Sequence, residues 1–174
     1  MEDLRYPIGE FKYDEEIRDH QLDLKIKQIE DAPKNLRIAV DGLSEKQLDT
    51  PYRPEGWTLR QVVHHLADSH MNGFIRFKWA LTEDSPTIKA YDEKRWAELS
   101  DSFEDIQVSL SLFDVLIKKW VLLLKSLSPE DLEKKFIHPD SGLVSLRRNI
   151  HLYAWHGDHH IAHITSLKKR MGWE

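Results

Sequence analysis

Apolar side chains recur every three or four residues in four separate stretches of the chain. This spacing places them on one face of an amphipathic α-helix. In the third stretch, which is the clearest, the apolar positions are Ile106, Leu110, Phe113, Ile117, Trp120 and Leu124. The same pattern predicts helices over about 14–43, 58–83, 104–127 and 145–171. The chain is therefore expected to be an all-α protein.

Local signals indicate where these helices begin and end. Thr58 is followed three residues later by Gln61, which is a capping-box pattern at the start of the second helix. Ser128 and Pro129 end the third helix. Pro33 fits the first turn of a helix and not its interior, so we expect the first helix to break or kink there.

Three long connections, 44–57, 85–103 and 128–144, separate the predicted helices. Loops of this length are uncommon in a simple up-and-down bundle, often carry function, and permit crossover topologies. Turn residues between short apolar runs predict a small hairpin within 134–146. The chain has no internal repeat, and its 174 residues suffice for one core, so we expect a single domain over 1–174.

Composition narrows the class of protein. Hydrophobic residues make up 40% of the chain and charged residues 32%, as in a soluble globular protein. The formal net charge of −5 argues against nucleic acid or an anionic membrane as a partner. The N-terminus lacks a signal-peptide pattern, and the most apolar run, WVLLLKSL, is too short to cross a bilayer. We therefore expect a cytoplasmic protein.

The chain contains no cysteine. Disulfides and thiolate metal ligands are therefore excluded, and any nucleophilic thiol must come from a substrate or cosubstrate. The absence of cysteine also fits a reducing compartment.

Histidine is unusually dense in two of the predicted helices. The chain has ten histidines, of which eight lie in these helices: His64, His65, His70, His151, His156, His159, His160 and His163. His156 and His160 are four residues apart, so their rings share a helix face and can converge on one ion at ~2.0–2.1 Å. His159 and His163 form a competing pair.

His65, on the second helix, is the candidate third ligand. It lies beside Val62 and Leu66 and so faces partly inward, and His64 is turned away from it by about 100°. Three neutral imidazoles with a water in the remaining position describe an open, reactive divalent site. Gly157 takes the place of the glutamate in an HExxH motif, so a zinc-protease site with a built-in general base is excluded.

Other polar side chains have both a functional and a structural interpretation. Asp68 lies three positions after the second-helix ligand and could orient it or activate a bound water, or it could be a surface carboxylate. Arg60 and Arg76 could hold an anionic substrate, but ordinary surface ion pairs are the simpler interpretation. His64 and His159 are expected at solvated positions.

Three blocks, YPIGEF (6–11), WTLRQVVHHLADSHMN (57–72) and YAWHGDHHIAHI (153–164), together resemble the DinB/YfiT-like family of metal-dependent hydrolases and bacillithiol transferases. The resemblance covers nearly the whole chain. It implies a four-helix bundle with long crossover loops, a homodimer, and one divalent ion, zinc or nickel, held by three histidines. Carried over residue by residue, the ligands are His65, His156 and His160.

The resemblance leaves the reaction open. We expect a hydrolase in which the ion activates water to attack an electrophile. In the alternative, a transferase, the ion would bind a low-molecular-weight thiol as a thiolate, and the missing general base favours this version. A non-catalytic protein that binds metal or a small molecule is a third interpretation, and purely structural histidines a fourth. The expected partners are a small-molecule substrate and, for a transferase, the thiol cosubstrate.

Overall fold

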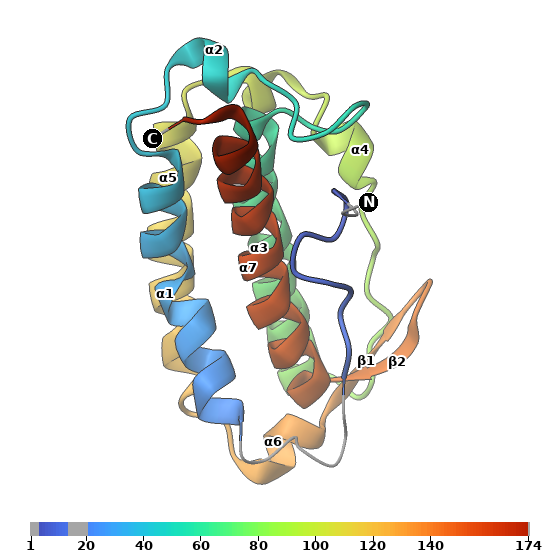
Figure 1. The fold of residues 1–174 in the computed structure, drawn as a ribbon. Helices are drawn as coiled ribbons and strands as arrows, with labels where there is room; N and C mark the ends of the chain where they lie inside the picture. Colours follow the sequence, from blue (N-terminus) through green and yellow to red (C-terminus); the bar gives the residue numbers. More distant parts are fainter. Residues whose placement is uncertain (1–3, 14–20, 174) are drawn as a thin grey trace.

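Four long helices pack side by side around a shared apolar core in a computed structural model, which describes residues 4–13 and 21–173 (Figure 1). The predicted four-helix bundle is confirmed. The long helices are α1 (Leu22–Val40), α3 (Leu59–Thr82), α5 (Ile106–Leu124) and α7 (Leu146–Met171). No helix among the described residues combines the length and the apolar character needed to cross a membrane.

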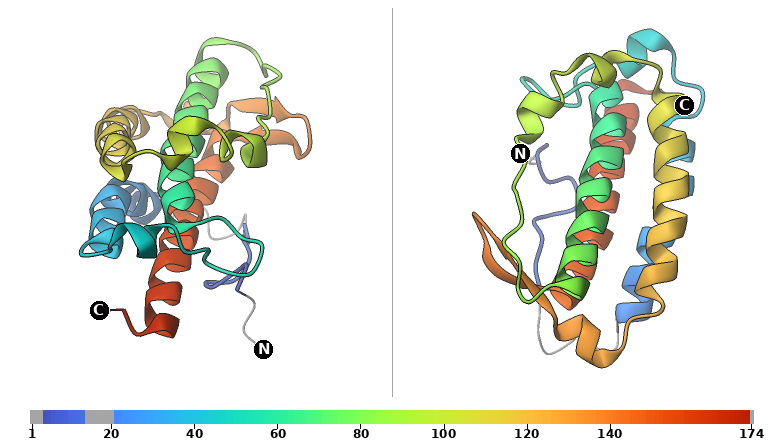
Figure 2. Two further views of the ribbon diagram at one scale, coloured as in Figure 1. Left: turned by 90° about the horizontal axis from the view of Figure 1, so that it is seen from above. Right: turned by 180° about the vertical axis from the view of Figure 1, so that it is seen from behind.

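Helices that follow one another in the chain do not all pack as neighbours. α1 and α3 each pack against both α5 and α7, so α1 lies diagonally across the bundle from α3 (Figure 2). α3 and α5 run in the same direction (Figure 1), and a hydrogen bond from Arg60 Nη1 to the Glu104 carbonyl (3.1 Å) joins their starting ends. The connection between them must therefore return along the length of the bundle, which confirms the predicted crossover.

The connections contain short elements of their own. These are α2 (Glu45–Leu48), α4 (Glu93–Trp96), a 3₁₀ turn η1 (Ser100–Phe103), α6 (Pro129–Glu133), β1 (Lys135–His138) and β2 (Gly142–Ser145). β1 and β2 form an antiparallel hairpin, as the pattern over 134–146 predicts. The Ile88 N–H donates to the Ile137 carbonyl (3.0 Å), which fastens the crossover connection to the hairpin.

The first helix differs from its prediction in one respect. The predicted start near Asp14 lies outside the described residues, and the described helix begins at Leu22. Of the break or kink expected at Pro33, the break is wrong, because α1 continues through this residue to Val40. Pro33 is buried, and buried residues precede and follow it along the helix. Packing against α5 and α7 thus outweighs the ~3 kcal/mol cost of an interior proline.

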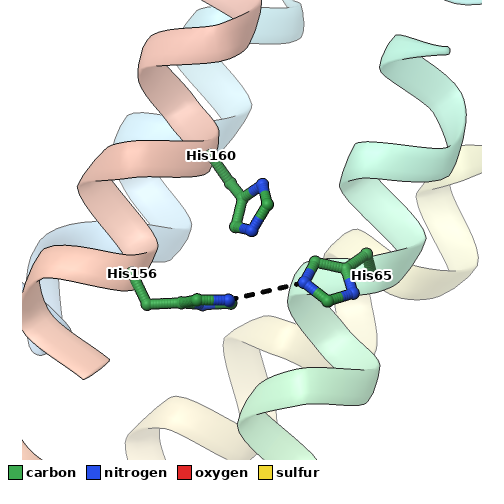
Figure 3. A group of neighbouring side chains, drawn as sticks. All are labelled: His65, His156 and His160. Carbon is green, nitrogen blue, oxygen red and sulfur yellow. Dashed lines mark hydrogen bonds between the residues drawn. The ribbon is translucent and has the colours of Figure 1, made fainter. Parts of the chain in front are cut away.

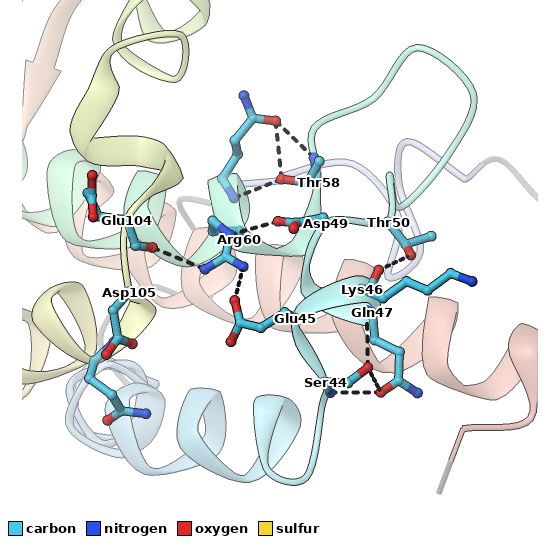
Figure 4. Close-up of polar contacts among 12 residues, drawn as sticks. Ser44, Glu45, Lys46, Gln47, Asp49, Thr50, Thr58, Arg60, Glu104 and Asp105 are labelled. Atoms are coloured by element: carbon cyan, nitrogen blue, oxygen red, sulfur yellow. Dashed lines mark hydrogen bonds and ion pairs between the residues drawn. The ribbon is translucent and has the colours of Figure 1, made fainter.

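The predicted helix ends agree with the structure. The Thr58 side chain accepts a hydrogen bond from the Gln61 backbone, and the Gln61 side chain accepts one from the Thr58 backbone, which completes the capping box of α3 (Figure 4). Ser128 caps the short helix α6 after α5 has ended. These caps set where the first turn of α3 begins, two turns before His65.

Candidate metal centre

The antiparallel packing of α3 against α7 brings three histidine rings together (Figure 3). His65 Nε2 lies 3.4 Å from His156 Nε2. The His160 ring centroid lies 4.6 Å from that of His65 and 4.5 Å from that of His156. One nitrogen from each of the three rings lies within 4.8 Å of the other two. The structure therefore juxtaposes the three residues that the sequence pointed to.

Burial keeps these rings neutral. Loss of water lowers the pKa of His65 to about 3, and the neighbouring histidines contribute to this shift. Burial likewise holds the pKa values of His156 and His160 well below the ordinary value of 6.5. A metal ion competes with protons for the imidazole lone pair, so a neutral ring is the form that can bind it.

The spacing of the nitrogens fits a divalent ion. Two nitrogens bonded to one ion at ~2.0–2.1 Å with a tetrahedral angle lie roughly 3.3–3.4 Å apart. The 3.4 Å between His65 Nε2 and His156 Nε2 matches this separation. Three imidazoles are a donor set suited to zinc, nickel, copper or iron. The residues present therefore fit the implied metal.

A second histidine group lies one turn further along α7. His159, His160 and His163 also place one nitrogen each within 4.8 Å of one another. His163 Nε2 donates to the Arg5 carbonyl (3.0 Å), so that nitrogen already has a partner. Among the described residues, only the pair His156 and His160 forms a possible metal-binding group with a histidine of α3. The competing pair, His159 and His163, does not.

His64 and His159 do not lie at solvated positions, so this expectation is wrong. Their exposed fractions are 6% and 7%. His64 Nδ1 lies 2.7 Å from Ser109 Oγ of α5, and its Nε2 donates to the carbonyl of Glu104, which lies just before α5 (3.1 Å). His159 is covered by the N-terminal segment, since its ring lies 5.8 Å from that of Tyr6.

The block YPIGEF runs along α7 in the opposite direction. The Arg5 and Gly9 carbonyls accept hydrogen bonds from His163 and Trp155 (3.0 and 3.2 Å). Phe11 packs near the Trp155 ring, with 5.9 Å between ring centroids. From the other side, Trp57 lies against His65, with 4.6 Å between ring centroids. The histidine face is thus enclosed by segments from both sides.

Comparison with known proteins assigns the family. The model of the DinB superfamily matches residues 28–164. The chain belongs to the DinB superfamily. The DinB chain is 60% identical to a Bacillus cereus protein and 59% identical to a Bacillus anthracis protein, each over 173 residues that cover 99% of this chain and 100% of the relative. Both relatives carry the name "Putative metal-dependent hydrolase".

Solved structures agree with this assignment. The DinB chain superposes on YfiT from Bacillus subtilis with a TM-score of 0.95 and 51% identity, over 98% of this chain and 99% of YfiT. That protein is described as a probable metal-dependent hydrolase with an unusual four-helix bundle topology. TT2238, a four-helix bundle protein, matches with a TM-score of 0.55 and 18% identity over 80% of this chain and 94% of its own, and shows the fold alone.

Asp68 lies half-buried on α3 of the DinB chain. Burial and then the nearby Asp101 raise its pKa to about 6. Among the described residues, its carboxylate makes no hydrogen bond to a histidine. Asp68 therefore lies three residues after His65 on α3, but it is not part of the histidine cluster.

The two arginines differ in their surroundings. Arg60 is 5% exposed and binds the carboxylates of Glu45 and Asp49, so its guanidinium is buried and ties α2 to α3 (Figure 4). Arg76 instead lines a cavity of about 360 Å³ beside His156. A larger groove of about 690 Å³ lies between α1 and α5 and has no histidine among the described residues of its wall.

Arg148 and Asn149 of α7 also line the cavity beside His156, and neither was predicted from the sequence as a site residue. A signal was available, because Asn149 precedes His156 by seven residues. Two helical turns return a side chain to nearly the same face. The polar residues before the HxxxH pair were therefore candidates for the same site.

Proposed function

We propose that this DinB protein is a hydrolase that uses one divalent ion, zinc or nickel, held by His65, His156 and His160. The observation that carries the proposal is the convergence of three neutral imidazoles from two helices, of which His65 and His160 are buried and His156 is half-buried. The names of its relatives in Bacillus support the same reaction class.

The ion, when bound, supplies Lewis-acid chemistry that lowers the pKa of a water and polarises an electrophile. His65 would hold it from α3, and His156 and His160 would hold it from α7. Three protein ligands leave a coordination position open, as in catalytic sites. Trp57 packs on the His65 and His160 rings and limits access of bulk water from that side. The cavity beside His156 is the route by which a substrate would enter.

Asp68 is the carboxylate that we propose for proton transfer. Its pKa of about 6 lies near neutral pH, where a carboxylate can both accept and release a proton. An ordinary aspartate accepts a proton less readily at that pH. Asp68 would hold the proton on a carboxylate oxygen, one helical turn from His65.

A second candidate is transfer of a low-molecular-weight thiol to an electrophile. One observation favours it: the position after His156 holds Gly157, so the helix supplies no glutamate base at the place where HExxH enzymes have one. A thiol bound as a thiolate attacks without such a base.

Metal analysis and a turnover assay test the proposal together. We expect about one zinc or nickel per chain after loading, and hydrolysis of ester or amide substrates that chelation stops and metal restores. His156→Gln should lower both metal content and turnover at least tenfold, because one of three ligands is lost. Metal content is measured by mass spectrometry and turnover with and without an added thiol.

His151→Gln provides the matched control. His151 is a buried histidine of α7 outside both histidine groups, with its ring 5.3 Å from that of Tyr13. This variant should keep its metal. Full metal content in His156→Gln would reject the ligand set. Turnover only with thiol would replace hydrolysis by transfer, and bound metal without any turnover would indicate a binding protein.

A further inference from the structure

The cavity beside the histidine cluster carries unused cationic groups. Arg76 of α3 and Arg148 of α7 both line it. Neither guanidinium forms an ion pair within 4.0 Å of a carboxylate of the described residues. Burial raises the pKa of Tyr153, and the nearby Arg76 acts against this rise. Other arginines of the bundle are paired, namely Arg37, Arg60 and Arg147. Two guanidinium groups are therefore available to bind an anion within the cavity.

A buried amide in the same wall points to a ligand. Asn149 is 2% exposed, and its Nδ2 has no hydrogen-bond partner among the described residues. Buried polar groups are nearly always hydrogen-bonded, because burial removes their hydrogen bonds to water and leaving them unpaired is destabilising. Asn149 lies next to Arg148 in the chain and shares the cavity wall with it. An acceptor atom of a bound molecule would satisfy this donor.

The net charge of the residues that line the cavity suits a ligand with one negative charge. Arg76 and Arg148 contribute two positive charges, and Glu93 is the one carboxylate among the described lining residues. Burial and the nearby Arg76 lower the pKa of His138, which favours its neutral form. The wall thus carries a net charge of about +1, which matches a monoanion better than a dianion.

The remaining wall is largely apolar. Phe11, Phe136, Val144 and Leu152 line the cavity together with the arginines. A volume of about 360 Å³ lies within the range of sites for small organic molecules. The wall therefore suits an acid with a hydrophobic body and not a small inorganic anion.

We propose that this cavity binds substrates in which a single carboxylate is joined to an apolar body. Arg76, Arg148 and Asn149 donate hydrogen bonds to the carboxylate, and the apolar side chains enclose the body. The proposal rests on the proposed function in one respect, namely that the reacting bond faces His156. Carboxylate binding itself needs no metal and can be measured separately.

The test uses the full chain, freed of metal by chelation, and isothermal titration calorimetry with 3-phenylpropionate. We expect saturable binding, at least tenfold tighter than binding of the neutral 3-phenylpropanol and tighter than binding of phenyl phosphate. Arg76→Gln and Arg148→Gln should each weaken 3-phenylpropionate binding about tenfold, which corresponds to about 1.4 kcal/mol. Circular dichroism establishes that both variants keep the helical fold.

Two controls separate this proposal from the proposed function. Arg95→Gln removes the same charge from an exposed residue that does not line the cavity, and should bind 3-phenylpropionate as the wild type does. His65→Gln should lose metal and keep carboxylate binding, because His65 is absent from the cavity wall. Equal affinity for the acid and the alcohol, or equal losses in Arg95→Gln and the cavity variants, would overturn the proposal. Tighter binding of phenyl phosphate would replace the carboxylate by a phosphate.

Discussion

The two nitrogens of a histidine ring have different partners in this protein. His64 and His163 donate from Nε2 to backbone carbonyls, and His70 donates from Nδ1 to the Leu66 carbonyl (2.8 Å). Each of these rings has its tautomer fixed by a carbonyl acceptor. Within the described residues, His156 Nδ1 has no such partner, and its Nε2 faces His65. The carbonyl hydrogen bonds therefore mark His64, His70 and His163 as histidines with a structural role.

At the same scale, Asp68→Asn should stabilise the protein at pH 8. The pKa of Asp68 is about 6 in the folded state and about 3.8 when exposed, so folding disfavours its ionised form. The folded state holds more protons between these values, and stability falls as pH rises through this window. Asparagine removes a cost on the order of 1–2 kcal/mol, after a discount for solvent screening. Urea unfolding of metal-free protein at pH 8 and pH 3.5 measures the difference.

The gain should vanish at pH 3.5, where the wild-type carboxyl is largely neutral. Asp84→Asn, on an exposed loop, should show no such gain at pH 8. If Asp68 also transfers the proton, the stabilised variant should lose turnover at least tenfold. A stabilised variant with full activity would limit Asp68 to a structural role.

At the scale of helices, one glycine allows three of them to meet. A Cβ placed on Gly73 of α3 would lie 2.4 Å from Tyr153 Cζ and 2.7 Å from a Trp120 ring atom. Tyr153 belongs to α7 and Trp120 to α5, and both rings are buried. The Tyr153 hydroxyl also donates to the Ser69 carbonyl (3.0 Å), which fixes its position. Gly73 therefore sets how closely α3 approaches its two neighbours.

Gly73→Ala should destabilise the bundle by about 1–3 kcal/mol, because a methyl group has no room among fixed aromatic rings. Gly157→Ala is the matched change on α7. A Cβ there would meet Ala32 Cβ at 3.5 Å and His70 Nε2 at 3.8 Å, which are ordinary contacts. Alanine should be tolerated or stabilise by up to ~1 kcal/mol through helix propensity. Chemical denaturation of both variants checks the contrast, and equal effects would contradict it.

At the scale of the whole molecule, the candidate metal centre joins two halves of the bundle. α1 and α7 pack together, as do α3 and α5, and the histidines bridge α3 to α7. A bound ion would therefore add a link between helices that are distant in the chain. The homodimer implied by the resemblance stays a prediction.

Metal binding should raise the melting temperature. Binding to the folded state alone adds about 2.7 kcal/mol at a free-metal concentration of about 100 times Kd. For a chain of this length, that corresponds to roughly 5–10 °C. Differential scanning calorimetry with zinc or nickel, against a chelator, measures the shift. His65→Gln should abolish it and His151→Gln should not, and an unchanged shift in His65→Gln would argue against the bridge.

The sequence by itself determined the four helices, the capping box at Thr58, the hairpin and the family. These features depend on local periodicity, short-range hydrogen bonds or the residue motifs themselves, all of which are present in the linear chain. It also indicated which histidines could act together, because spacing of four residues places rings on one helix face.

Histidine spacing left open which pair meets His65, although the family resemblance implied His156 and His160, and the tertiary structure shows that this pair does so. The pairs His156–His160 and His159–His163 have the same spacing, and the packing of α3 against α7 selects between them. Packing between the helices also keeps α1 helical through Pro33, and it buries the side chain of His64. It paired Arg60 with carboxylates and placed Arg76 in the cavity wall, because contacts between distant segments depend on helix arrangement and not on local pattern.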